Sequence, residues 1–159
     1  MPAIELSTFI RASRERVFDL ARSIDAHQES TGGTEERAVA GVTKGLIGMN
    51  GEVTWEARHL GVRQRLTVRV TSFDRPRHFQ DTMISGAFRS MVHDHEFSEH
   101  PEGTLMSDRY VFKSPLGILS GIVDRIFLTA YMRRFIVRRN TVLKQLAESE
   151  EWRRYLEKS

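Results

Sequence analysis

Residues 118–148 read ILSGIVDRIFLTAYMRRFIVRRNTVLKQLAE, and this stretch decides the fold of the chain. It contains no proline, and Gly121 is its one internal helix breaker. Its apolar residues recur at helical spacing, which predicts one amphipathic helix about 45 Å long. The stripe that we expect to face the core consists of Ile118, Leu119, Ile122, Val123, Ile126, Phe127, Ala130, Ile136, Val137, Leu143 and Leu146. A shorter helical tail is expected in EEWRRYLEK, residues 150–158.

Strands are predicted for most of the chain before this helix. The alternation is cleanest in residues 63–73, where one face carries Leu66, Val68 and Val70 and the other carries Arg65, Thr67 and Arg69. Further strands are expected at residues 3–12, 37–42, 51–59, 78–85, 87–99 and 104–113. A helical segment with Ser13 as its N-cap follows the first strand, and STGGT at residues 30–34 interrupts the helical pattern.

This order of elements is typical of the α+β class. The expected order is a strand, a helical segment, about six antiparallel strands and a long final helix. The strands form a sheet that must bury one of its faces, and the apolar stripe of the final helix covers that face. A strongly bent sheet wrapped around one helix leaves space between them for a small molecule. No internal repeat or low-complexity linker divides the sequence, so we expect a single domain over residues 1–159.

The composition excludes several classes of protein. The chain has no cysteine, so disulfides and thiol catalysis are excluded and a zinc site would need histidine and carboxylate ligands. The net charge of +3 is too small to indicate nucleic-acid binding. We find neither the pattern of a signal peptide nor an apolar run of roughly 20 residues, and therefore expect a cytoplasmic protein without stable membrane insertion.

Local motifs carry a resemblance to a known superfamily. The motifs are ERVFDLA (15–21), VTWEARHLG (53–61), RPRHFQDTMISGAF (75–88), HDHEF (93–97), GTLMSDRYVFKSPLG (103–117) and RRNTVLKQLAE (138–148). Over residues 3–148 the chain resembles the SRPBCC superfamily of START, Bet v 1 and polyketide cyclase/dehydrase-like proteins, in particular a bacterial branch described as cyclase/dehydrase-like or cell-division-related. The resemblance implies a helix-grip fold, in which a curved antiparallel sheet of six or seven strands wraps around the long C-terminal helix. It implies a hydrophobic cavity and does not imply an enzyme.

The sequence MVHDHEF, residues 91–97, is the most distinctive polar motif. On a strand, Met91, His93 and His95 share one face, whereas Asp94 points to the opposite face. The hairpin HPEG, residues 100–103, returns the chain antiparallel to this strand. We expect the hairpin to place Asp108 near His95 and Tyr110 near His93.

Three interpretations of this cluster remain open. Two histidines on one strand face could share a metal ion with Asp108, but the pattern is not specific and we expect neither a metal nor a cofactor. A pair of His95 and Asp108 could act as a general base, with Tyr110 donating to a developing oxyanion, as in a cofactor-free cyclase or dehydratase. Alternatively, His95 and Asp108 are buried and hydrogen-bond to each other, and the cluster only lines a pocket.

We expect this chain to bind a small hydrophobic ligand, such as a lipid, an isoprenoid or a polyketide, in the internal cavity. The candidate ligand-binding residues are Trp55, Met91, His93, His95, Asp108 and Tyr110. An alternative class is a protein-interaction module, because Arg134 and Arg138 lie four residues apart on the long helix and form a basic patch. The same two arginines are also explained without any partner, as part of a helix face that is exposed to solvent.

Overall fold

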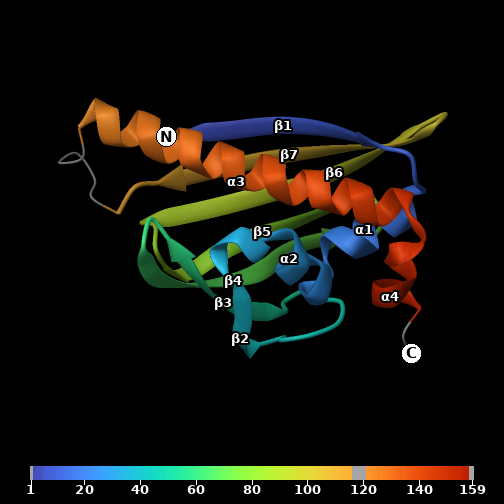
Figure 1. Cartoon of the computed structure of the whole chain (residues 1–159), viewed down its shortest axis with the longest axis horizontal. Helices are drawn as coiled ribbons and strands as arrows, with labels where there is room; N and C mark the ends of the chain where they lie inside the picture. The colour runs from blue at the N-terminus through green and yellow to red at the C-terminus, as the bar shows by residue number, and fades with distance from the viewer. Residues whose placement is uncertain (1, 116–120, 158–159) are drawn as a thin grey trace.

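Seven antiparallel strands form one sheet in the order β1-β7-β6-β5-β4-β3-β2 (Figure 1). The computed structural model describes residues 2–115 and 121–157, apart from the side chains of residues 123 and 124. The strands are β1 (Ala3–Ile10), β2 (Arg37–Gly41), β3 (Glu52–His59), β4 (Val62–Asp74), β5 (His78–Gly86), β6 (Ser90–His100) and β7 (Gly103–Lys113). They match the predicted strands to within three residues at each end, and the predicted curved antiparallel sheet is confirmed.

Two helices separate β1 from β2, where the sequence predicted one helical segment. Helix α1 (Arg14–Ala21) starts at Ser13, whose hydroxyl accepts a hydrogen bond from the Arg16 amide. Helix α2 (Ile24–Ser30) starts at Ser23, whose hydroxyl accepts from the Ala26 amide at 3.1 Å. Ser23 is thus a second N-cap within an apparently continuous helical pattern, and it turns the chain into a new helix. A 3-10 turn, η1 (Gly32–Thr34), ends the segment.

Helix α3 (Ile122–Glu148) runs along the sheet beside β1 (Figure 1). Near its C-terminal end, the Lys144 ammonium donates to the Phe9 carbonyl of β1 at 2.7 Å. The short elements η3 (Glu150–Trp152) and α4 (Arg153–Leu156) follow and account for the predicted helical tail. The predicted residues 118–120 of the long helix lie outside the described part of the chain. Among the described helices, none combines the length and the hydropathy needed to cross a membrane.

The predicted apolar stripe of α3 is correct only in its C-terminal half. Ile136, Leu143 and Leu146 are buried, whereas Ile122 is 77% exposed and Ile126 is 65% exposed. Other residues of the predicted stripe that are exposed are Phe127, Ala130 and Val137. The inward face of α3 carries Leu128, Met132, Arg139 and Asn140 instead. The prediction was wrong in the N-terminal half because both faces of α3 carry apolar residues there, so apolar spacing alone does not decide which face turns inward.

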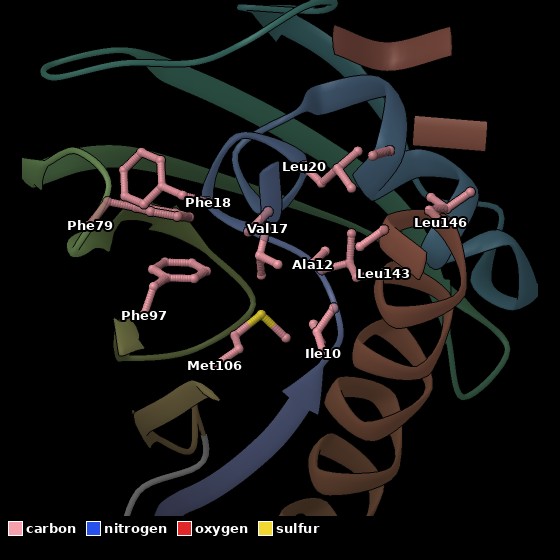
Figure 2. Packing of buried hydrophobic residues seen from close by; sticks show 13 residues of the cluster. Ile10, Ala12, Val17, Phe18, Leu20, Phe79, Phe97, Met106, Leu143 and Leu146 are labelled. Carbon is pink, nitrogen blue, oxygen red and sulfur yellow. The ribbon is translucent and has the colours of Figure 1, made fainter. Parts of the chain in front are cut away.

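One end of the space between α3 and the sheet is filled by a hydrophobic cluster (Figure 2). Phe18 of α1 is fully buried at its centre and makes edge-to-face contacts with Phe73, Phe79 and Phe97, with ring centroids 5.1 to 5.4 Å apart. Leu143 and Leu146 of α3 pack into the same cluster. Such edge-to-face aromatic packing adds to the stability that apolar burial provides. This end of the fold is therefore a solid core.

A second hydrophobic cluster surrounds the remaining space and does not fill it. Its buried members include Trp55 of β3, Val70 of β4, Met91 of β6, Phe112 of β7 and Met132 of α3. Of these side chains, Trp55, Met91 and Met132 line a cavity of about 230 Å³. The two clusters thus divide the interior into a packed end and a hollow end.

Candidate functional site

The cavity has mainly apolar walls, supplied by the sheet on one side and by α2 and α3 on the other. Trp55 and Met91, two of the predicted ligand-binding residues, line it. The Trp55 ring lies against the His27 ring, with centroids 4.3 Å apart, and this contact holds Trp55 in place. At the other end of the wall, Leu60 of the turn between β3 and β4 is 57% exposed, so this end leads toward the surface.

Histidines of β6 bring polar groups to the wall of this cavity. The pairing of β6 with β7 places His93 opposite Tyr110 and His95 opposite Asp108, which confirms the predicted register. Asp94 points to the opposite face of the sheet, where it accepts hydrogen bonds from His78 and from Gln80. The adjacency of the three residues His93, Asp94 and His95 in sequence is therefore not an adjacency of their side chains.

Asp108 is the centre of the buried polar cluster, although it does not line the cavity itself. Its side chain is 0% exposed. It accepts hydrogen bonds from His93 Nε2 at 2.8 Å and from Asn140 Nδ2 at 2.7 Å. A guanidinium nitrogen of Arg139 lies 3.3 Å away. Asp108 thus fixes the position of His93, which lines the cavity. The prediction that Asp108 contacts the ligand directly was wrong, because its side chain is enclosed behind the cavity wall.

Asp81 of β5 is a cavity residue that the sequence analysis missed. It accepts a hydrogen bond from His95 Nε2 at 3.0 Å and lines the cavity. The alternation of β5 does place Asp81 on the same face as buried Phe79, which is the signal that could have identified it. His95 Nδ1 lies 3.3 Å from Asp108 Oδ1, an ion-pair distance without the alignment of a hydrogen bond. His95 is therefore held between two carboxylates.

Arg139 and Asn140 of α3 complete the cluster and were also missed. Both are almost fully buried. Arg139 donates to Asn140 Oδ1 at 3.1 Å and to the Ala21 carbonyl at 3.4 Å. These bonds join α3 to the end of α1 as well as to the sheet. Buried charged groups need such partners because an unpaired buried charge is strongly unfavourable.

The surroundings favour the ionised form of the carboxylates of the cluster and the protonated form of His95. Burial by itself would raise the pKa of Asp108, but the hydrogen bond from His93 and the close approach of His95 hold that pKa well below its usual range. Burial also favours the neutral form of Asp81, and His95 outweighs it and lowers the pKa of Asp81. For His95, burial would lower the pKa, and the facing carboxylates Asp108 and Asp81 raise it. The buried charges of the cluster are therefore two carboxylates balanced by the Arg139 guanidinium and the His95 imidazolium.

His93 and Tyr110 are neutral at physiological pH. Burial and the neighbouring His95 cation lower the pKa of His93 to about 4. Burial raises the pKa of the Tyr110 phenol further above its usual value. Because Nε2 of neutral His93 donates to Asp108, its Nδ1 is left with a lone pair. Both His93 and Tyr110 line the cavity, so the wall presents one acceptor and one donor there.

A metal ion is one group that this cluster could hold. Asp81, His93 and His95 each offer a ligand atom, and these atoms lie within 4.8 Å of one another. Two histidines and one carboxylate form a donor set that divalent transition metals accept. A metal ion would have to replace the proton of His95, whose two nitrogens both face carboxylates. The expectation that no metal is used stays a prediction.

A curved antiparallel sheet that encloses a cavity against a long C-terminal helix defines a helix-grip protein. The chain belongs to the family described as polyketide cyclase/dehydrase and lipid transport, whose model matches residues 1–148. The resemblance to the SRPBCC superfamily is thereby confirmed. The link to cell division finds no support in these similarities. The family membership supports a fold that binds hydrophobic ligands and leaves the ligand open.

Solved structures show the same fold at low sequence identity. A protein from Thermus thermophilus has a TM-score of 0.75 at 18% identity, covering 91% of this chain and 95% of that protein. The di-domain ARO/CYC protein StfQ from the steffimycin biosynthetic pathway has a TM-score of 0.74 at 13% identity, covering 92% of this chain and 50% of StfQ. The major latex-like protein 151 from Panax ginseng has a TM-score of 0.67 at 12% identity, covering 92% of this chain and 97% of that protein. None of the curated proteins matches the chain.

Proposed function

We propose that this protein binds a small hydrophobic molecule in the cavity between α3 and the sheet. The observation that carries the proposal is an apolar cavity of about 230 Å³ with a polar group of residues on one wall. Apolar burial supplies the affinity, and His93 and Tyr110 orient the polar end of the ligand. Lipid transport in the description of the family supports the same class of ligand.

The direct experiment is native mass spectrometry of the protein purified from its own host. A co-purifying apolar small molecule is expected, and its mass defines the ligand. A second experiment uses 2-methylnaphthalene as an apolar probe of known size, because dry protein cavities of about 150 Å³ already bind benzene. Failure to bind any apolar molecule in both experiments would contradict the proposal.

Filling the cavity is expected to abolish binding of this probe. Ala57 on β3 and Leu128 on α3 both line the cavity, from opposite walls. The variants Ala57→Trp and Leu128→Trp should each weaken binding of 2-methylnaphthalene at least tenfold in isothermal titration calorimetry, because the added ring takes the volume that the probe needs. The matched control is Ala130→Trp on the exposed face of α3, which should bind as the wild type does. Unchanged affinity in both cavity variants would place the binding elsewhere.

A cofactor-free cyclase or dehydratase is the second candidate function. The observation in its favour is the pair of His93 and Asp108, in which Nε2 of the cavity-lining His93 bonds to Asp108 at 2.8 Å and leaves the lone pair of Nδ1 to act as a base. In such a reaction, Nδ1 would take a proton from an acidic carbon of a polyketide, the carbanion would attack a carbonyl carbon, and Tyr110 would donate to the oxygen that becomes negative. This assigns the base to His93, whereas the sequence favoured His95.

The enzyme hypothesis has its own test with a synthetic linear tetraketide thioester. Wild-type protein should accelerate aldol closure and loss of water, and His93→Gln should reduce that rate at least 100-fold. Binding of 2-methylnaphthalene should change by less than a few fold in the same variant, because the probe makes no hydrogen bond. Equal rates with and without wild-type protein would eliminate the enzyme hypothesis for this substrate and leave the binding proposal intact.

A further inference from the structure

We infer that the ligand of this cavity carries a neutral hydroxyl group on an apolar skeleton, as an alcohol or a phenol does, and that this hydroxyl bridges Tyr110 and His93. The inference rests on the proposed function and names the chemical class of the ligand. Three observations carry it, namely the charge balance of the wall, the free polar atoms in the wall and the volume that the wall encloses.

The charge balance of the cavity wall is complete. Each arginine and each carboxylate among the described wall residues has an opposite charge or a histidine as its partner, at 3.3 Å or less. The pairs are Arg22 with Asp19, Arg65 with Glu56, Glu36 with His27, Asp81 with His95, and Arg139 with Asp108. A ligand carboxylate or phosphate would find no unpaired cation in this wall and would lie close to the Asp81 carboxylate. A buried unpaired charge is strongly unfavourable, so the wall favours an uncharged ligand.

Two polar atoms of the buried wall keep hydrogen-bonding capacity that the described residues do not use. The Tyr110 hydroxyl makes no hydrogen bond within the described part of the chain, and His93 Nδ1 makes none either. Among the described residues, neither atom belongs to the fully enclosed polar atoms that lack a partner, and both residues line the cavity. The two rings are edge to face with centroids 5.1 Å apart, on directly opposite residues of β6 and β7.

The chemistry of these two atoms is complementary to a hydroxyl group. Tyr110 can donate a hydrogen bond, and the lone pair of His93 Nδ1 can accept one. A hydroxyl both accepts and donates, so one oxygen atom satisfies both wall groups. An ether or a ketone can accept from Tyr110 but leaves His93 Nδ1 without a donor. Leaving a buried acceptor unsatisfied is unfavourable, which separates a hydroxyl from these other neutral groups.

The test uses probes that share one apolar skeleton, chosen to fit the cavity volume, and that differ only in one substituent. A volume of about 230 Å³ suits a two-ring compound. The probes are 2-naphthol, 2-methoxynaphthalene, 2-methylnaphthalene and 2-naphthoate, and their dissociation constants are measured by isothermal titration calorimetry at pH 7. We expect 2-naphthol to bind roughly 5- to 25-fold more tightly than 2-methylnaphthalene, since each of two hydrogen bonds adds about a factor of five. The expected affinity of 2-methoxynaphthalene lies between these two, and that of 2-naphthoate is at least tenfold below that of 2-naphthol.

The variant Tyr110→Phe tests the residues as well as the ligand class. It removes the donor and keeps the ring, so the preference for 2-naphthol over 2-methylnaphthalene should fall about fivefold. The ratio of the two affinities within one variant cancels any change in packing. Tyr131→Phe is the matched control, because the Tyr131 hydroxyl lies in the same cavity wall but is hydrogen-bonded to His59 Nδ1 at 2.7 Å. Its preference for 2-naphthol should equal that of the wild type.

The possible failures are distinguishable. If 2-methylnaphthalene binds in the cavity but 2-naphthol binds no more tightly, the proposed function stands and the hydroxyl inference is overturned. Tightest binding of 2-naphthoate also overturns it, because an anion would then be the preferred head group. An unchanged preference in Tyr110→Phe overturns the assignment of the donor. If no probe binds at all, the proposed function fails and this inference fails with it.

Discussion

Replacing Asp108 with asparagine is expected to destabilise the fold by about 3–5 kcal/mol, the usual cost of removing one partner from a buried ion pair. The Asp108 side chain is fully enclosed and receives hydrogen bonds from His93, Arg139 and Asn140. The uncharged amide would leave the Arg139 guanidinium buried without its carboxylate. For a chain of this length, the thermal midpoint should fall by roughly 10 °C or more. Chemical denaturation at pH 7 measures the free energy, and a heating scan measures the midpoint.

Asp94→Asn is the matched control for this substitution. Asp94 lies on the opposite face of the same sheet, pairs with His78 and is partly exposed. Its replacement should cost about 1 kcal/mol or less, as for other exposed ion pairs. Equal losses for Asp94→Asn and Asp108→Asn would show that Asp108 has no special role.

A double-mutant cycle separates the charge effect from a packing effect. Arg139→Met should be strongly destabilising in the wild type, because it leaves two carboxylates with only His95 as a cation. In the Asp108→Asn background the same replacement should cost much less, since the charge that it removes is then already unpaired. Additive costs in this cycle would contradict the idea that Asp108 and Arg139 balance each other.

The sequence predicted the sheet and part of the candidate site for a physical reason. Strand side chains alternate with a period of two, and a short hairpin fixes the register of the strands that it connects. Both rules apply to β6 and β7, so the positions of His93, His95, Asp108 and Tyr110 could be predicted. Their hydrogen bonds could not, because ring rotation decides whether His93 or His95 bonds to Asp108.

The missed residues lie where neither rule applies directly. Asp81 meets His95 across β5 and β6, but the Cα pairing of these strands places it opposite His93. Predicting that contact requires the side-chain directions as well as the register. Arg139 and Asn140 lie on α3, whose rotation about its axis was inferred from apolar spacing alone. Apolar spacing does not reveal that buried Asp108 gives these two polar residues partners on the inner face. In the N-terminal half of α3 it fails for another reason, because apolar residues lie on both faces there.

The stability of the protein is expected to fall as the pH is lowered from about 6.5 to about 4, and His93 is the reason. Its pKa is about 4 in the folded protein, against an ordinary value of 6.5. A group whose pKa is lowered by folding binds its proton more readily in the unfolded chain, so protonation favours unfolding. The loss attributable to His93 across this range is about 3 kcal/mol, at 1.36 kcal/mol for each pKa unit. His95 acts in the opposite direction: its raised pKa reduces stability only as the pH rises above 6.5.

The variant His93→Gln isolates this contribution, because glutamine does not titrate and its amide can still donate to Asp108. Urea denaturation at intervals from pH 4 to pH 8 gives the free energy of unfolding of both proteins. The variant should be less stable than the wild type above pH 7 by a constant amount, since His93 is neutral there in both the folded and the unfolded chain. Below pH 6.5 the difference in unfolding free energy should shrink. The unfolded wild-type chain then binds up to one proton more than the folded protein, at residue 93, and the wild type loses stability. Titration of Asp108 does not contribute to the difference between the two proteins, because the pKa of Asp108 in the folded protein lies well below this range. Parallel curves from pH 4 to pH 8 would mean that His93 is not held neutral by burial, and the acceptor assigned to its Nδ1 would then be lost as well.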